Sequence, residues 1–589
     1  MPDLTPPAEP AGPRHDCIVL GAGIAGVTAA RAIARAGRSV LLLEGSGRVG
    51  GRMATRRDFV AGPGLDPLAF PLETGAEYVH VSHRDRRYAD FWDEVRLFFG
   101  STRFPKQEHN RVAFPPDWSR PRELVATVAS DPFILASSMM LKELRTYDGP
   151  DVSAGEYLDG KKYRKKGREL AEYTLTAHTP GFLSGDLAVS VRGLAADRIP
   201  DQLLELAEYR IQRPSGALCG YDALPEAIRR DFERAAGRPD ALLLGRKVVS
   251  VRRTEAGDVV VRTAAGEAFT GASALCTFSV GMLANGTKEE KDIFGPLLTE
   301  RKRRALRLVR MGAITKLSLQ FRRPVWGQGS RMTVLSHPRG RGRGSTFFSA
   351  FPDRPDGPFV LTALLMGADH AEIAPLDDEA AWRRVLGSIE AVCNPPAGPA
   401  WRPWAPEEVL VGTGAGADFR PNLARKDWAR DEFALGGNSC LCHEPGAGLR
   451  VEEAREALRD PRESLPLFWA GEATAPAYRP GYQPLSVHGA YVSGVEAARD
   501  VLAYLGGGRD AAGFAACYEE RRRGAERAEE AVEAAMSALP ARFAVGLGTA
   551  DLERLRALAE RRLGVRVEDL VTCGLVRLLA ELEASEAEP

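Results

Sequence analysis

Two short apolar runs near the start of the chain, each closed by a polar or glycine-rich turn, lead to the first prediction. The first run, Cys-Ile-Val-Leu, leads into Gly21, Gly23 and Gly26 and then into an Ala-rich segment. This pattern is typical of a buried parallel strand, a tight turn and a helix packed closely on the strand. The second run, Val-Leu-Leu-Leu, ends in Glu44, where a carboxylate can accept hydrogen bonds from a ribose. Because a helix N-terminus attracts phosphate, the pattern predicts a dinucleotide-binding unit.

The pattern changes further along the chain. Residues 85–215 combine mixed charge, aromatic clusters and helical spacings, which predicts an inserted, largely helical lobe. The stretch around Lys316 alternates instead, so we expect a sheet with one buried face and with Lys316 on the wet face. An apolar strand at 466–470 ends in a turn, and a helix is expected to begin near Val487. Beyond residue 506, apolar positions at helical spacing predict amphipathic helices.

Composition narrows the class of protein. Hydrophobic residues make up 44% of the 589 residues and charged residues 27%, with Lys plus Arg and Asp plus Glu equal at 79 each. These values are typical of a globular protein, with no global field to attract nucleic acid or an acidic membrane. The N-terminus lacks the apolar segment of a signal peptide, and no apolar run is long enough to span a bilayer.

The distribution of the cysteines favours a reducing compartment and does not indicate a metal site. The eight cysteines are scattered and suggest no disulfide framework, which favours a reducing cytoplasm. The run Cys440-Leu-Cys442-His443 lacks a fourth ligand and the usual spacing of a zinc site. We therefore expect no metal and a cytoplasmic location.

Further motifs extend the N-terminal pattern. Arg48-Val-Gly-Gly-Arg52 follows Glu44, Glu73-Thr-Gly-Ala-Glu-Tyr-Val-His80 comes next, and Gly471-Glu-Ala-Thr precedes Ser486-Val-His-Gly-Ala. Together they resemble the flavin-containing amine oxidases, the group of monoamine and polyamine oxidases. The resemblance implies an α/β fold with a Rossmann-type FAD-binding domain. It also implies the GR2-like, p-hydroxybenzoate-hydroxylase-like two-domain architecture, with an α+β substrate domain and a C-terminal helical extension.

The domain boundaries are predicted from these motifs and from the change in the pattern of charged, aromatic and apolar residues between them. A disordered leader is expected at 1–14 and a helical extension at 506–589. The FAD-binding domain is discontinuous, at 15–84, 216–290 and 464–505, and the substrate-binding domain takes 85–215 and 291–463.

The resemblance assigns contacts with FAD to residues along most of the chain. These residues are Gly21, Gly23, Ile24, Ala25, Gly26, Glu44, Gly45, Arg48, Gly51, Arg52, Gly75, Ala76, Glu77, Val248, Gly471, Glu472, Ser486 and Val487. The helix beginning near Val487 would direct its N-terminal dipole at the flavin and stabilise the negative charge of the reduced form. Asn438 stands where family members that bind flavin covalently have a cysteine, so FAD is expected to be non-covalent.

Lys316 is the catalytic candidate. On alternation alone it is a polar residue on the wet face of a strand. The family, however, has a lysine on this strand, before a Phe and a Trp, that holds a water against flavin N5 and is linked to reoxidation by O2. The resemblance therefore implies that role for Lys316.

The candidates for substrate contact are His80, Ser439 and Tyr482. Ser439 and Ser486 align with the two aromatic rings that flank the flavin in monoamine oxidases, and their small size argues against a monoamine cage. Glu77-Tyr-Val-His80 follows Gly75-Ala76 without the Arg that clamps carboxylates in amino-acid oxidases, which argues against free amino acids. His80 is equally compatible with a structural role, and Glu77 with either a cation or solvent.

The predicted activity is oxidation of an amine to an imine by hydride transfer to flavin N5, followed by reduction of O2 to H2O2 and hydrolysis of the imine. The substrate is expected to be a polyamine or an amine-bearing metabolite, and a homodimer is possible. Three alternatives stay open: an L-amino-acid oxidase, a carotenoid- or protoporphyrinogen-type FAD desaturase, and a non-catalytic flavoprotein scaffold.

Overall fold

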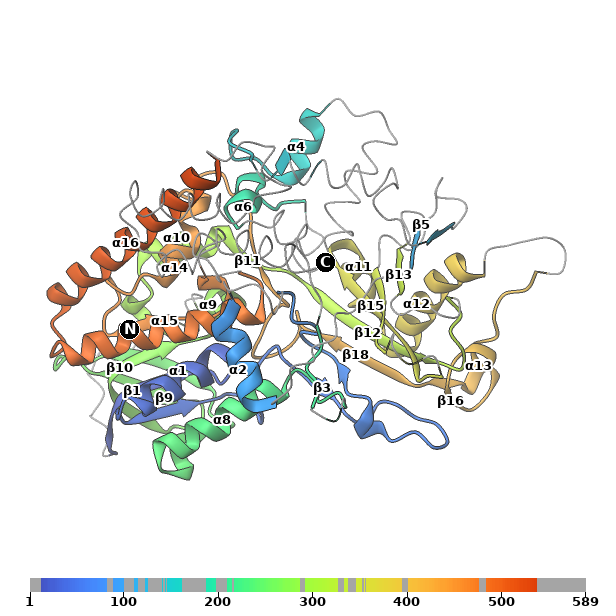
Figure 1. Ribbon diagram of the computed structural model, residues 1–589, viewed down its shortest axis with the longest axis horizontal. Helices are drawn as coiled ribbons and strands as arrows, with labels where there is room; N and C mark the ends of the chain where they lie inside the picture. The colour runs from blue at the N-terminus through green and yellow to red at the C-terminus, as the bar shows by residue number, and fades with distance from the viewer. Residues whose placement is uncertain are drawn as a thin grey trace, which may run out of the picture.

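In the computed structural model, two seven-stranded sheets lie side by side, joined by long segments that cross between them (Figure 1). The structure describes residues 12–81, 88–99, 111–114, 122–125, 140, 143–144, 146–161, 187–197, 209–213, 215, 217–286, 292–326, 333–336, 346–351, 354, 356–394, 401–475 and 484–537.

The first sheet, on the left of Figure 1, is the predicted dinucleotide-binding unit. Strand β1 (Arg14–Leu20) lies between β2 (Val40–Leu43) and β10 (Ala268–Cys276), and both neighbours run parallel to it. Strand β20 (Leu467–Trp469) pairs in parallel with β10. The residues of β2 are all buried, because helices cover both faces of a largely parallel sheet. The two strands predicted from the first apolar runs are therefore confirmed.

Helices from segments far apart in the sequence cover the two faces of this sheet. On one face, α1 (Ile24–Arg35) packs against α8 (Ala223–Ala236) and α15 (Val487–Gly506), so the first and last parts of the nucleotide-binding unit share one core. The other face packs against α10 (Glu300–Leu308) and α14 (Ala454–Arg459).

The packing corrects the predicted domain boundaries in two places. Helix α2 (Ala89–Phe99) inserts Phe91, Trp92 and Val95 into the core beside α1, although the sequence placed it in the substrate domain. Helices α10 and α14, also placed there, cover the nucleotide-binding sheet. An amphipathic helix reveals that it has an apolar face but not which sheet receives it, so the packing of these three helices could not be predicted from the sequence.

The second sheet has the strand order β18-β12-β15-β14-β13-β5-β6. Strand β12 (Ile314–Phe321), second in this order, pairs antiparallel with β15 (Phe359–Met366) and with the edge strand β18 (Leu423–Asp427). Beyond β15 the sheet continues through β14 (Thr346–Ser349), β13 (Thr333–Ser336) and β5 (Arg111–Phe114) to the other edge strand, β6 (Arg122–Val125). Because β5 and β6 come from the stretch 85–215, that stretch is not purely a helical lobe.

The prediction of one wet face for β12 was wrong, since all eight of its residues are buried. Leu317 and Leu319 pack against α12 (Asp378–Cys393) as expected. The polar face is covered by the chain that follows the glycine-rich loops: Gln320 exchanges hydrogen bonds with the backbone of Ala61 at 2.7 and 3.0 Å. Tertiary packing, which alternation cannot report, covers the second face.

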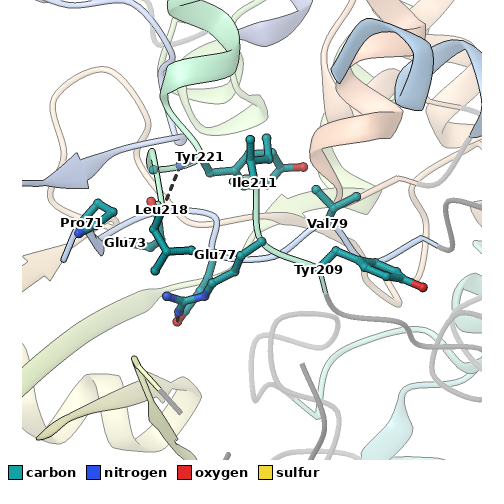
Figure 2. A pocket seen from close by; sticks show the side chains of 10 residues that line it. Pro71, Glu73, Glu77, Val79, Tyr209, Ile211, Leu218 and Tyr221 are labelled. Atoms are coloured by element: carbon teal, nitrogen blue, oxygen red, sulfur yellow. Dashed lines mark hydrogen bonds and ion pairs between the residues drawn. The ribbon is translucent and has the colours of Figure 1, made fainter. Parts of the chain in front are cut away.

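A short connection stiffens the junction between the two sheets. Strand β4 (Leu72–Glu73) pairs with β3 (Thr55–Arg56), and Val79, just after it, forms a backbone bridge with Tyr209 (Figure 2). This segment follows the glycine-rich loops in the chain and contacts Lys316 of strand β12.

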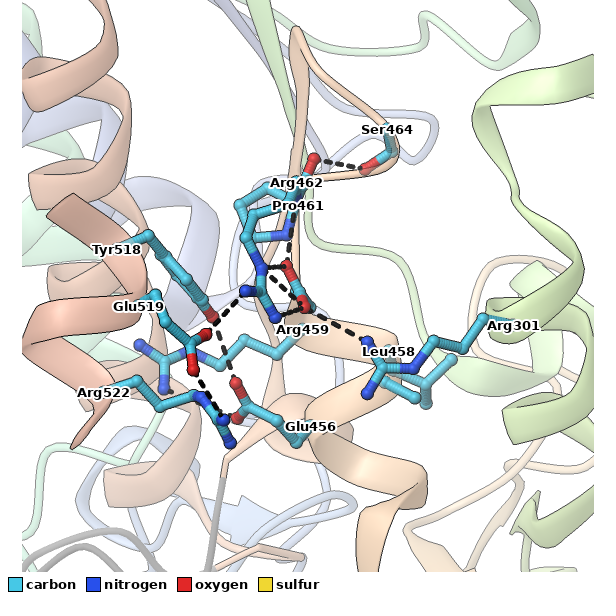
Figure 3. A network of polar contacts seen from close by, with 12 residues as sticks. Arg301, Glu456, Leu458, Arg459, Pro461, Arg462, Ser464, Tyr518, Glu519 and Arg522 are labelled. Atoms are coloured by element: carbon cyan, nitrogen blue, oxygen red, sulfur yellow. Dashed lines mark hydrogen bonds and ion pairs between the residues drawn. The ribbon is translucent and has the colours of Figure 1, made fainter. Parts of the chain in front are cut away.

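The C-terminal helix α16 (Ala511–Ser537) runs along the edge of the nucleotide-binding unit. Phe514 and Tyr518 enter the core beneath it. Arg462 bonds to Asp460 and to Glu519 of α16 at 2.6 Å each (Figure 3). The second predicted helix, around Val567 to Leu582, lies outside the described residues. Among the helices that are described, none is both long and apolar enough to cross a membrane.

Candidate active site

The first glycine-rich turn forms a cradle at the N-terminus of α1. Gly21 has a φ of +97°, and a Cβ on Gly26 would lie 1.9 Å from the carbonyl oxygen of Gly21, so only glycine permits this approach of helix and strand. At Gly23 a Cβ would meet no atom within 4 Å. This open space lies before the unpaired N–H groups of the helix, where a pyrophosphate fits.

The second loop closes over the first. Gly50 forms a parallel bridge with Gly23, and its N–H donates to the carbonyl of Ala22 at 2.8 Å. Glu44 accepts from the N–H groups of Ala22 (2.7 Å) and Ser46 (2.8 Å). Each of its oxygens keeps a lone pair free. The residues therefore fit an adenosine diphosphate half, with Glu44 placed to receive ribose hydroxyls.

The remaining nucleotide-side residues surround this turn. Ile24 and Ala25 are buried in the first turn of α1. A Cβ on Gly45 would strike the ring of Phe433 at 2.5 Å. Val248 begins β8 (Val248–Arg253), two residues after Arg246, whose N–H bonds to the carbonyl of Glu44.

The two arginines of the Arg-Val-Gly-Gly-Arg motif have different partners. Arg48 turns back onto its own loop and donates to the carbonyls of Val49 and Met53 at 3.2 and 3.0 Å. Arg52 donates to the carboxylate of Glu472 at 2.7 Å and to the carbonyl of Gly437 at 3.0 Å. Arg48 thus shapes the loop, whereas Arg52 ties the N-terminal motif to the C-terminal one.

Glu472 belongs to a buried chain of charges that sequence reasoning missed. Ser439 donates to Glu472 at 2.7 Å, and Arg455 donates to Ser439 at 2.8 Å and to both oxygens of Asp197 at 2.7 Å. Burial alone would raise the pKa of Glu472, but Arg52 and Arg455 outweigh it and the pKa is lowered. Burial raises the pKa of Asp197 despite Arg455. Glu472, which was predicted to anchor the cofactor, therefore belongs to a network with Ser439 and Arg455 that the sequence did not reveal.

Ser439 does not have the position that a substrate contact requires. It is fully buried on β19 (Ser439–Leu441), and its hydroxyl is committed to Glu472 and Arg455. In the structure its hydroxyl group points into the Glu472–Arg455 network. The substrate role predicted for Ser439 is therefore corrected to an internal structural one.

The C-terminal motif ends in the predicted helix. Gly471 and Glu472 turn directly after β20, and the Gly471 N–H donates to Ser493 of α15 at 2.9 Å. Ser486 caps α15 by accepting from the Gly489 N–H at 3.0 Å. The N–H of Val487, in the first turn, has no carbonyl partner within the helix and suits a flavin carbonyl.

His488, one residue further along α15, stays neutral. Burial lowers its pKa to about 3, with a smaller contribution from His80, and its ring packs edge-on against Tyr88 at 5.2 Å. His80 is half-buried beside Tyr78. Tyr482 lies outside the described residues.

The segment Glu73–Glu77 brings Lys316 to this junction. Gly75 and Ala76 pair with the backbone of Ala54 and Arg52 at 3.1 and 3.0 Å. Lys316 Nζ donates to the carbonyl of Glu73 at 3.3 Å and to Glu77 Oε2 at 2.8 Å. The lysine of the second sheet therefore reaches the chain that leads back to the Arg52 loop.

Glu77 is held from its other side by Arg210, which bonds to Oε1. Burial alone would raise the pKa of Glu77, but Lys316 and Arg210 outweigh it and the pKa is lowered. Glu73, Glu77 and Arg210 line a small pocket together with Tyr209 and Tyr221 (Figure 2). Glu77 thus meets cations, one of the two outcomes that the sequence left open.

Glu73, beside it, behaves differently. Burial raises its pKa to about 7, and its carboxyl group contacts the Thr55 hydroxyl at 2.7 Å and the Tyr221 N–H at 2.8 Å. Glu73 belongs to the Glu-Thr-Gly-Ala motif of the sequence analysis, which assigned it no role of its own. Arg210 had no recognisable sequence signal, because it is a single charged residue in a mixed segment.

The two cysteines of the Cys-Leu-Cys run lie close together as free thiols, with Sγ atoms 3.7 Å apart. Both are buried on or next to β19. His443 bonds to Asp151 at 3.1 Å. Within the part of the chain that the structure describes, no group of three His, Cys, Asp or Glu side chains is arranged to hold a metal ion.

Curated relatives with 23–25% identity match most of the chain. A lysine-specific histone demethylase 1 homolog 2 of Oryza sativa subsp. japonica is 25% identical over 513 residues, covering 85% of this chain and 59% of that protein. Polyamine oxidase 2 of Arabidopsis thaliana is 24% identical over 500 residues, covering 82% and 87%. The chain thus spans less than two thirds of the demethylase homologue but most of the polyamine oxidase.

Solved structures with the same fold include amine oxidases. Putrescine oxidase bound to putrescine superposes with a TM-score of 0.61 at 16% identity, covering 83% of this chain and 99% of that one. Cyclohexylamine oxidase from Brevibacterium oxydans IH-35A gives 0.60 at 18%, covering 84% and 100%. The family model for flavin containing amine oxidoreductases matches residues 24–502. With the glycine cradle, Glu44 and the Arg52–Glu472 link in place, the chain belongs to the flavin containing amine oxidoreductase family, as an FAD-dependent amine oxidase.

Proposed function

We propose that this enzyme oxidises a primary or secondary amine, either a polyamine or another amine-bearing metabolite, and passes the electrons to O2. The observation that carries the proposal is the position of Lys316. Strand β12 holds its ammonium group against the backbone of Glu73, in the segment that pairs with the Arg52 loop. When bound, FAD accepts a hydride from the α-carbon of the amine and reduces O2 to H2O2, while water hydrolyses the imine to a carbonyl compound and an amine or ammonia.

The residues of the chain divide this work. The glycine cradle and Glu44 hold the nucleotide half, and the N-terminus of α15 stabilises negative charge on the reduced flavin. Lys316 supplies a positive charge and an N–H donor for the reaction with O2. FAD is proposed to be held without a covalent bond.

The local charge favours the reactive form of the substrate. When Glu73 is protonated, Lys316 and Arg210 outnumber Glu77 at this junction, and a positive environment lowers the pKa of a bound amine. A neutral amine can release hydride, whereas an ammonium ion cannot. No separate catalytic base is then needed.

The substrate class follows from the relatives only as a proposal. Polyamine oxidase 2 and putrescine oxidase favour an aliphatic diamine or polyamine. The L-amino-acid oxidase of Mus musculus is 23% identical over 482 residues, covering 78% of this chain and 67% of that protein. Because of this relative, the test below includes amino acids as substrates. Cytoplasmic location and a homodimer stay predictions.

The test is anaerobic bleaching of the flavin absorbance with a panel of putrescine, spermidine, cyclohexylamine and L-amino acids, followed by a peroxide assay in air. We expect bleaching by at least one aliphatic amine and one H2O2 for each carbonyl product. Bleaching by amino acids alone would replace the proposal with the L-amino-acid oxidase alternative. A flavin that no donor reduces would favour the scaffold alternative.

A further inference from the structure

Glu77 stands between two buried cations, each on its own carboxylate oxygen. Lys316 Nζ donates to Oε2 at 2.8 Å, and Arg210 Nη2 donates to Oε1. The side chains of all three residues are at most 10% exposed. The cluster therefore consists of two positive charges bridged by one negative charge, shielded from solvent.

Only a carboxylate can make this bridge. Its two oxygens both accept hydrogen bonds, whereas an amide of the same shape offers one acceptor and one NH2 donor. With a glutamine at position 77, either Lys316 or Arg210 would face a donor. The two cations also lower the pKa of Glu77 against the effect of burial, so the bridging form is the ionised one.

Arg210 is the rigid side of the cluster. Its guanidinium lies over the ring of Tyr78 at 5.0 Å and near that of Phe351 at 5.9 Å. The residue before it, Tyr209, is tied to Val79 by a backbone bridge. Lys316 has a flexible stem with about 2 kcal/mol of rotamer entropy to lose, so its position depends on what its ammonium binds.

The ammonium of Lys316 has one donor to spare. It has three N–H groups, and among the described residues it donates to Glu77 and to the Glu73 carbonyl. Two fixed acceptors determine the direction of the third N–H. That donor is free for a water or a flavin atom on the cofactor side.

We propose that Glu77, anchored by Arg210, is the positioning residue for Lys316: it directs the third N–H toward the flavin and offsets one of the two buried positive charges. This inference rests on the role of Lys316 under the proposed function. Glu77 does not itself have to touch the flavin or the substrate.

The test uses the FAD-loaded enzyme without any amine. The flavin is reduced with light under nitrogen, mixed with O2 in a stopped-flow instrument, and its midpoint potential is measured separately. The variants are Lys316→Met, Glu77→Gln, their combination, and Glu432→Gln as control, since Glu432 makes an exposed pair with Lys247. Flavin-to-protein ratios and melting temperatures show that each variant is folded and loaded.

We expect Glu77→Gln to slow reoxidation about tenfold, and the double variant to be no slower than Lys316→Met. The midpoint potentials should move in opposite directions. Loss of the anion at 77 stabilises the negatively charged reduced flavin and raises the potential, while loss of the cation at 316 lowers it. A role in folding alone would not produce opposite shifts.

If the two single effects on reoxidation multiply in the double variant, or Glu77→Gln reoxidises at the wild-type rate, the inference is overturned. Should Glu77→Gln fold poorly, Arg210→Gln serves instead, because it removes the anchor but leaves the Glu77–Lys316 pair. It should also slow reoxidation, and wild-type rates would overturn the anchoring role. These outcomes are independent of the amine panel, so failure of the proposed substrate class is recognised separately.

Discussion

Two buried carboxylates, Glu472 and Glu77, each lie between cations, but their clusters are built differently. Glu472 bonds to Arg52 and Ser439, and the chain continues through Arg455 to Asp197, with two carboxylates balancing two arginines. Glu77 bridges Lys316 and Arg210, so these three side chains carry one positive charge in excess, and among the described residues one N–H of Lys316 has no acceptor.

The two clusters therefore have different roles: one fixes the geometry of the FAD-binding motifs, and the other takes part in the reaction. A closed, neutral cluster has every strong donor matched by an acceptor, so it fixes the geometry of the two FAD-binding motifs. An open, positive cluster offers a charge and a donor to what binds beside it. Variants in the first should change stability and FAD retention, and variants in the second should change reaction rates.

The largest effect is expected for Arg455→Met. It leaves Asp197 buried without its bidentate partner and Ser439 without a donor. Removing one partner of a buried ion pair costs about 3–5 kcal/mol. Urea unfolding should report a loss of this size together with loss of FAD on gel filtration. A variant of wild-type stability would contradict the closed-cluster view.

Glu73→Gln tests the carboxyl group next to the open cluster. Burial raises the Glu73 pKa from 4.5 to about 7, so between these values the folded state binds more protons than the unfolded state. Stability is then lost as pH rises from 4.5 to 7, by about 3 kcal/mol in all. The glutamine variant, which mimics the protonated acid, should lack this loss when unfolding is followed from pH 5 to 8. Parallel pH profiles for the two proteins would disprove the raised pKa.

Lys316→Met tests directly whether the Glu77 cluster acts in the reaction rather than in FAD binding. The Met side chain keeps the volume of the stem while the charge is lost, and Glu77 still has Arg210. FAD should remain bound and reoxidation by O2 should slow at least tenfold, which corresponds to about 1.4 kcal/mol in the barrier. Stopped-flow mixing of the reduced enzyme with O2 measures this. Unchanged reoxidation would remove Lys316 from the reaction.

Ser439→Ala is expected to have the smallest effect on the reaction. It removes hydrogen bonds from Ser439 to Glu472 and from Arg455 to Ser439, which should cost about 1–3 kcal/mol at most in the free energy of unfolding. The KM for the amine should not change, because Ser439 is fully buried. A large change in KM with normal stability would restore the substrate role that the alignment suggested.

Local sequence determined the nucleotide-binding unit. The strands β1 and β2, the cradle at Gly23 and the start of α15 at Val487 all agree with the prediction. They do so because glycine spacing, apolar runs and caps act over a few residues, and such local signals survive in any tertiary context. The family motifs likewise gave FAD and amine chemistry without any distance being known.

Only the tertiary structure decided what the charged side chains do. Lys316 was expected on a wet face and is buried, Ser439 was expected at the substrate and is internal, and Arg210 and Arg455 carried no signal. The physical reason is that an ion pair joins residues far apart in sequence, such as Arg52 with Glu472 and Lys316 with Glu77. Periodicity states which side of an element is polar, but the partner that covers that side is set by packing between elements.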